Sequence, residues 1–143
     1  MILISHRGNI NGRNPERENT VSYIQEALDQ GFNVEVDVWK IGSKFYLGHD
    51  SAQNGASIDF LSQNGIIAHC KNINALESCV NSNIHCFFHD TDDVVLTSKQ
   101  LLWVYPGKSL GRYAYRSILV LPEIDEVPYC YGVCSDNILK YKK

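Results

Sequence analysis

The first half of the chain alternates between two hydrophobic periods. Residues 33–40 place valines on one face and Glu35, Asp37 and Trp39 on the other, a period of two that predicts a strand. Residues 21–30 have apolar positions at helical spacing, between the capping residue Thr20 and Gly31. The same reasoning predicts strands at Ile2–His6, Asn33–Lys40, Ser43–His49, Ile66–Cys70 and Ile84–His89, and helices at Val21–Gln30, Ile58–Gln63 and Asn74–Val80.

Helical periodicity fades in the second half. Short apolar runs, separated by polar or Gly/Pro segments, predict strands at Val94–Thr97, Leu101–Tyr105, Ser117–Leu121 and Tyr131–Cys134. Strand–helix alternation favours parallel strands with right-handed crossovers. An eight-fold barrel uses about 250 residues, and 143 residues leave no room for its full helical ring. We therefore predict one α/β domain over residues 1–143, a compact TIM-type (β/α) barrel with several second-half helices shortened or missing. An incomplete barrel completed by a partner chain, and hence a homo-oligomer, is the alternative.

Composition and charge narrow the classes of partner. The chain is 44% hydrophobic and 20% charged, which is ordinary for a globular domain. Its 13 basic and 16 acidic residues form no basic arm, so we expect no nucleic-acid partner. No apolar run approaches the roughly 20 residues that span a bilayer, and the first apolar run is too short for a secretory signal. We therefore expect no transmembrane segment and a cytoplasmic location, with the five cysteines as reduced thiols.

Polar residues gather where the first strands end. His6 ends the first strand, Glu35 and Asp37 share one face of the second, and His49 closes the hairpin. The C-terminal ends of strands form the active-site mouth of a parallel barrel. Two carboxylates on one face of a strand repel each other unless a cation neutralises them, which favours a divalent metal. Histidines suit proton transfer near neutral pH. The alternative is a buried ion network with Arg7 and Lys71, which the Glu-x-Asp spacing alone favours.

The combination of four motifs is more specific. His6-Arg7-Gly8, Glu18-Asn19-Thr20, Val34–Val38 and Gly48-His49-Asp50 follow one another in the first fifty residues. In order and spacing they resemble the glycerophosphodiester phosphodiesterase family, metal-dependent TIM barrels among the phosphatidylinositol-phospholipase-C-like phosphodiesterases. The resemblance implies that His6 and His49 are the general acid and base, that Glu35 and Asp37 ligate the metal, and that Arg7 neutralises the phosphate. Glu18 and Asn19 would support the first loop.

The chain departs from that family at the third parallel strand. Where the family usually has Glu-x-Lys, this chain has His69 followed by Lys71, so His69 takes the position of the third metal ligand. Imidazole suits transition metals better than calcium, which prefers six to eight oxygen ligands. We therefore expect Mg²⁺ or Mn²⁺ rather than Ca²⁺, with Lys71 retained at the phosphate. A positively charged His69 that replaces the metal altogether is the alternative.

The second half resembles the family only weakly. Glu123 could supply a further carboxylate ligand and His89, at the end of the fourth parallel strand, could support the site. Packing or hydrogen-bonded roles are comparably favoured for such second-half residues. Gly132–Asp136 is similar to the family's closing strand.

The resemblance implies hydrolysis of a small-molecule phosphodiester, of the glycerophosphodiester kind met in lipid metabolism. A neighbouring hydroxyl of the substrate would attack the phosphorus, which requires two proton shuttles and no protein nucleophile. The alternative is a noncatalytic or differently specific barrel that binds a phosphorylated or glycan ligand.

Overall fold

The computed structural model describes residues 1–143, in which ten strands form a single sheet. Neighbouring strands run in the order β6, β5, β2, β1, β10, β9, β8 and β7; all of these are parallel except β7, and β3 and β4 extend from β2 as an antiparallel ribbon. The strands are β1 (Ile2–His6), β2 (Asn33–Ile41), β3 (Lys44–Leu47), β4 (Asn54–Ala56), β5 (Ile66–Cys70), β6 (Cys86–Phe88), β7 (Val94–Leu96), β8 (Leu102–Val104), β9 (Ser117–Val120) and β10 (Gly132–Ser135).

Three α-helices lie in the first half: α1 (Val21–Asp29), α2 (Ile58–Leu61) and α3 (Ile73–Asn81). The Thr20 hydroxyl accepts a hydrogen bond from the Tyr23 amide at the start of α1, and Asn72 caps α3 through the Ala75 amide. The predicted helices are thus confirmed, as is the parallel pairing of the strands predicted around residues 2–6, 33–40, 66–70 and 84–89, which are β1, β2, β5 and β6. The second half has only the 3₁₀ helices η1 (Gly111–Arg116) and η2 (Ile138–Tyr141).

The predicted TIM-type barrel is wrong. A (β/α) barrel places a helix between successive parallel strands, whereas β7 and β8 form an antiparallel hairpin and no α-helix follows α3. A parallel crossover usually needs a dozen or more residues, most often as a helix. Residues 105–116 and 121–131 are the two second-half crossovers, and Pro106, Gly107, Pro122 and Pro128 within them disfavour helix. They form loops and a 3₁₀ turn instead.

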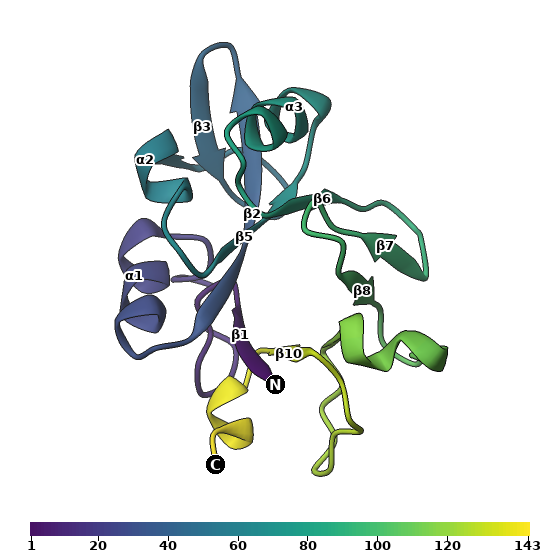
Figure 1. The fold of residues 1–143 in the computed structure, drawn as a ribbon. Coiled ribbons are helices and arrows are strands. Elements are labelled where there is room, and N and C mark those ends of the chain that lie inside the picture. The colour runs from purple at the N-terminus through teal and green to yellow at the C-terminus, as the bar shows by residue number, and fades with distance from the viewer.

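The sheet curls around an interior without closing into a strand-paired barrel (Figure 1). Its edges β6 and β7 are not paired with each other. A backbone hydrogen bond of 2.8 Å from the Ser98 amide to the Cys86 carbonyl joins the segment after β7 to β6. The sheet is therefore a curled partial barrel, in which strand pairing is interrupted between β6 and β7.

Two apolar clusters pack on opposite faces of the first-half sheet. The outer cluster fills the space between the sheet and the helices, with Ile24, Val36 and Cys79 among its members. The inner cluster lies within the curl, where the rings of Phe87 and Trp103 meet with centroids 4.7 Å apart. All five cysteines are buried free thiols.

The inner face changes from apolar to polar along five strands. Five apolar side chains of the inner cluster are each followed two positions later, on the same face, by a polar side chain. The pairs are Ile4 and His6, Ile67 and His69, Phe87 and His89, Trp103 and Tyr105, and Cys134 and Asp136. The strands therefore carry their polar side chains to one end of the interior. No helix has the length and apolar character that crossing a membrane requires.

Candidate metal centre

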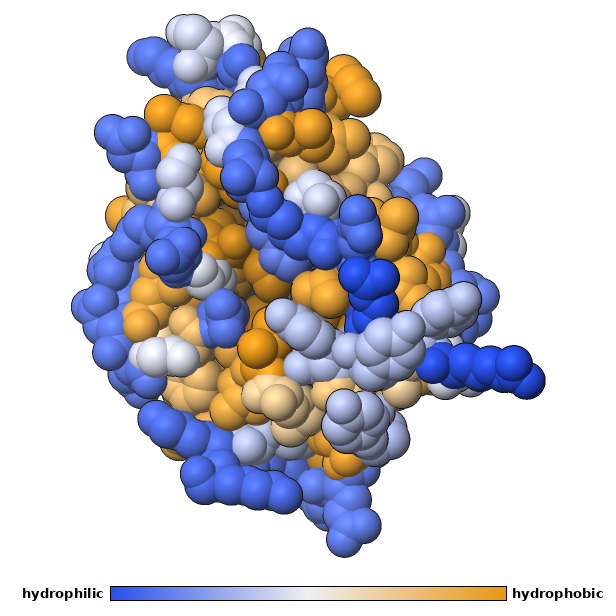
Figure 2. All heavy atoms as spheres, viewed as in Figure 1, coloured by the Kyte–Doolittle hydropathy of each residue, from blue (hydrophilic) through white to orange (hydrophobic).

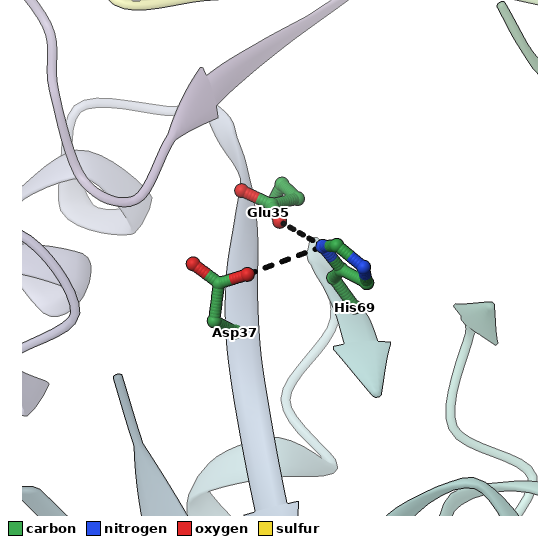
Figure 3. A group of neighbouring side chains, drawn as sticks. All are labelled: Glu35, Asp37 and His69. Atoms are coloured by element: carbon green, nitrogen blue, oxygen red, sulfur yellow. Dashed lines mark ion pairs between the residues drawn. The ribbon is translucent and has the colours of Figure 1, made fainter. Parts of the chain in front are cut away.

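Three buried side chains from neighbouring strands converge at the polar end of the interior (Figure 3). Glu35 and Asp37 lie on β2, and His69 lies on β5 in register with Asp37. Nδ1 of His69 is 3.1 Å from Asp37 Oδ1 and 3.5 Å from Glu35 Oε1. Glu35 is 2% exposed, Asp37 0% and His69 8%. The expected ligand set is thus brought together by strand pairing and by the period-two alternation of β2.

One polar atom of each of these residues is buried without a hydrogen-bond partner. These atoms are Glu35 Oε2, Asp37 Oδ1 and His69 Nε2. Burying an unpaired polar atom costs about 1–3 kcal/mol, and more when the group is charged. Each residue offers a ligand atom, and these atoms lie within 4.8 Å of one another. A cation at the cluster would face the two carboxylates and Nδ1 of His69, whereas the unpaired Nε2 lies on the far side of the ring (Figure 3).

Asp37 is also held by the first loop and by Lys71. Arg7 Nε lies 3.0 Å and Lys71 Nζ 3.7 Å from its carboxylate. Asn19 donates to Asp37 Oδ2 at 2.9 Å and accepts from the Asp37 amide at 3.0 Å. Arg7, Lys71 and Asn19, which the sequence placed at the phosphate and in the first loop, thus surround the same carboxylate, whereas Glu18 pairs with Arg7 at 3.3 Å. Arg7 and Lys71 fit the buried ion network as well as they fit a substrate site.

The loop after β1 requires glycine at position 8. Gly8 has φ +93°, a left-handed conformation that side chains disfavour. A Cβ atom there would lie 2.7 Å from Tyr23 Cδ1 on α1. Arg7 precedes it with φ 56°, so the backbone reverses directly after the strand. This reversal turns Arg7 back toward Asp37.

His6 is oriented by a residue from the closing strand. Its Nδ1 lies 2.7 Å from Asp136 Oδ1, and its Nε2 lies 3.8 Å from Glu35 Oε2. Asn9 donates to Asp136 at 2.8 Å and to Glu18 at 2.9 Å, which links the first loop to the end of β10. The aspartate therefore fixes one ring nitrogen of His6 and leaves the other directed at the cluster.

Electrostatics favour the charged forms of the cluster. Burial alone lowers the pKa of His69, but the carboxylates of Asp37 and Glu35 outweigh burial and raise that pKa to about 9. Burial disfavours ionised Asp37, yet His69, Arg7 and Asn19 hold its pKa well below the usual range. Burial is the largest influence on the pKa of His6 and lowers it, but the bond to Asp136 and the charge of Glu35 together raise that pKa above its usual value.

Of the two expected proton shuttles, His49 lies outside this cluster. Its side chain is 46% exposed, and its Nδ1 lies 2.8 Å from Asp50 Oδ1. It lines a cavity of about 240 Å³ together with Arg7, Glu18 and Asn19. Arg7 therefore borders both the buried cluster and the cavity of His49.

The second-half candidates divide into one at the site and one away from it. The ring of His89 stacks on Tyr105 with centroids 3.7 Å apart and lies 5.9 Å from the ring of His69. Glu123 is exposed and accepts a hydrogen bond of 3.0 Å from the Ser135 hydroxyl. The structure thus places His89 beside the cluster, and it assigns Glu123 no place among the ligand atoms.

Sequence reasoning placed Asp136 only within a segment similar to the family's closing strand, and it gave Asn9 and Tyr105 no role at the site. Asp136 follows β10 on the inner face, two residues after buried Cys134, and the alternation of that short strand was the available signal. Tyr105 has the same relation to Trp103 on β8. Asn9 has no comparable signal, because its position depends on the reversal at Arg7 and Gly8.

Comparisons with protein-family models, with curated proteins and with solved structures found no match to this chain.

Proposed function

We propose that Glu35, Asp37 and His69 hold a divalent cation, Mg²⁺ or Mn²⁺, and that the chain hydrolyses a small-molecule phosphodiester at this site. The observation that carries the proposal is the buried cluster, in which ligand atoms of all three residues lie within 4.8 Å of one another. Two carboxylates and one imidazole suit Mn²⁺ and other transition metals better than calcium. The motifs shared with glycerophosphodiester phosphodiesterases support the choice of substrate. Five free thiols fit a reducing, cytoplasmic setting.

The charges of the inner site support a phosphodiester ligand. Glu35, Asp37 and Asp136 outnumber Arg7 and Lys71 by one negative charge, while Glu18 pairs with Arg13 at the rim. A divalent cation that displaces the proton of His69 changes this excess to one positive charge when His6 is neutral. A phosphodiester carries one negative charge and would balance it. Arg7 and Lys71 both touch Asp37, so a phosphate beside the cation would lie within their reach.

His6 is the best-placed proton-transfer group. Asp136 holds its Nδ1, so Nε2 faces the cluster and is free to exchange a proton with the substrate. His49 would act from the other side of Arg7, in the polar cavity that both line. A bound cation would stabilise negative charge on the phosphoryl oxygens and lower the pKa of a nearby hydroxyl. No protein nucleophile is required.

A noncatalytic binding site is the second candidate. The ion pairs of Asp37 with Arg7 and Lys71 favour it, because they neutralise that carboxylate without a metal. In that case, a phosphorylated or glycan ligand would bind without bond cleavage.

Hydrolysis assays with glycerophosphodiesters and bis(p-nitrophenyl) phosphate, with and without Mn²⁺, separate these functions. We expect metal-dependent turnover that His6→Ala lowers by about 10²–10⁴-fold, the usual loss for a positioned acid or base. His85→Gln, at the other end of the interior, is the matched control and retains turnover. Metal-independent hydrolysis, or full activity in His6→Ala, would refute the assignment. Ligand binding without turnover would favour the second candidate.

A further inference from the structure

A second cavity lies at the opposite end of the interior from the metal centre. It has a volume of about 470 Å³ and is bordered by the segments in which β1, β2, β5 and β6 begin. Such a volume lies in the range of small-molecule sites, about 300–1,000 Å³. The inner apolar layer of Ile4, Phe87 and Trp103 belongs to the cluster that separates the cavity from the polar end. The two sites are therefore distinct.

The cavity combines an aliphatic floor with a polar rim. Ile2, Ile67 and Leu101 line it and pack in the inner apolar cluster. The N-terminus lies below the centre of the view in Figure 1, and Ile2 next to it lines the cavity; Figure 2, in the same view, shows apolar atoms exposed between hydrophilic ones. The apolar residues at this end of the interior therefore line a cavity that a ligand could fill.

Among the residues that line the cavity, Lys99 carries the one full charge at neutral pH, which is positive. Lys99 lines the cavity and donates from its ammonium group to the Asn83 side chain, which also lines it. His85 lies beside them, bonded through Nε2 to Thr97 Oγ1 at 2.8 Å. Burial and Lys99 lower the pKa of His85 to about 4, so its ring is neutral at neutral pH. No aspartate or glutamate lines the cavity, although the chain has 16 acidic residues.

We infer that this cavity binds a small amphipathic anion, with its apolar body on Ile2, Ile67 and Leu101 and its anionic group at Lys99. The aliphatic floor offers no partner to a fully polar ligand, whose desolvation would go uncompensated. The lone lysine and the absence of carboxylates disfavour cations. Asn83 and Lys99 together present hydrogen-bond donors to a carboxylate or phosphate. The inference is independent of phosphodiester hydrolysis.

Octanoate, octanol and octylamine are matched probes, because they share a chain and differ in charge. Amide chemical shifts of the labelled protein report where each binds, and titration calorimetry gives affinity. We expect saturable octanoate binding with shifts at Asn83, Lys99 and Leu101, and at least about tenfold weaker binding of the other two, because they lack the charge-assisted bond. Lys99→Met should weaken octanoate by about tenfold and leave octanol unchanged.

Lys44→Met is the control for loss of one surface charge, since Lys44 is exposed on β3. It should bind octanoate like the unaltered protein. Equal binding of all three probes, no octanoate binding, or an unchanged affinity in Lys99→Met would overturn the inference. A stable dimer that protects the amides of Asn83 and Tyr131 from exchange would also overturn it, because a second copy would then cover the cavity.

Discussion

The interior of the sheet has two layers that differ in what stabilises them. Ile67, Phe87 and Trp103 form an apolar layer in which shape and buried area decide stability. His69, His89 and Tyr105 follow these three residues by two positions each and belong to a polar layer. Through His69, this layer contacts Glu35 and Asp37. The comparison teaches that the apolar layer mainly stabilises the fold, whereas the polar layer holds the groups that could bind a cation or move a proton. Substitutions in the two layers should consequently fail in different ways.

The largest loss of stability is expected in the apolar layer. Trp103 is 2% exposed and packs on Phe87. Trp103→Ala should lower the free energy of unfolding by about 4 kcal/mol, because transfer and cavity costs add. Urea denaturation measures the change. Leu96→Ala, at a side chain that is 63% exposed, is the control and should change stability by under about 0.5 kcal/mol. Similar losses in both variants would contradict a packed inner layer.

In the polar layer, loss of one charge should destabilise by leaving its partners uncompensated. Asp37→Asn keeps the shape of the side chain but removes the charge that faces Arg7, Lys71 and His69. We expect a loss of about 3 kcal/mol in urea denaturation without metal, as for a broken buried ion pair. Asp50→Asn, at a side chain that is 92% exposed, should leave the free energy of unfolding nearly unchanged. An unchanged free energy of unfolding in Asp37→Asn would mean that the charge of Asp37 does not stabilise the charges around it.

Acid should destabilise the apolar end through His85. The pKa of this residue is about 4 in the folded chain, against about 6.5 for an unperturbed histidine. Above pH 6.5 both states are neutral. As the pH falls from 6.5 to 4, only the unfolded state takes up the proton, so stability falls, and below pH 4 this loss is complete.

For a side chain that is partly solvated, the loss from His85 should reach about 2 kcal/mol, the full shift being discounted for solvent. Urea denaturation at pH 7, 5.5 and 4 of the unaltered protein and of His85→Gln isolates it, because other groups titrate in both. Parallel pH profiles for the two proteins would disprove a depressed pKa at His85.

The pH dependence of metal affinity in the polar layer should come from a histidine whose pKa is raised, whereas the pH dependence of stability at the apolar end comes from one whose pKa is lowered. His69 must lose its proton to ligate, and in the metal-free protein its pKa is raised to about 9. Mn²⁺ affinity should therefore fall by about tenfold, or 1.4 kcal/mol, for each pH unit between 8 and 6. His69→Gln should bind more weakly and with a shallower slope in calorimetric titrations. An identical slope in that variant would exclude His69 as the competing group.

The raised pKa of His69 could not be predicted from the sequence. An unperturbed histidine would place the loss of metal affinity near pH 6.5. The neighbouring carboxylates move it upward, and their distances to His69 become known only from the pairing of β2 with β5. The alternation of residues 33–40 predicted that Glu35 and Asp37 share a face, since that is a local property of a strand.

The features that local sequence could not predict depend on long-range pairing and loop geometry. Nothing local in Val94–Leu96 indicates that it turns back antiparallel on β8. Asp136 reaches His6 only because β10 pairs with β1, although the two lie at opposite ends of the chain. His49 appeared equivalent to His6 by motif, yet the hairpin β2–β3 carries it to an exposed position beside Asp50.

The measurement that tests the central claim most directly is a calorimetric titration of the metal-free protein with Mn²⁺ at pH 8. The account predicts one saturable site per chain, abolished in Glu35→Gln and retained in Glu77→Gln, a matched substitution at an exposed glutamate on α3. Circular dichroism of Glu35→Gln establishes that the variant is folded. No saturable binding by the unaltered protein, or equal binding by a folded Glu35→Gln, would contradict the assignment of Glu35, Asp37 and His69 as a cation site.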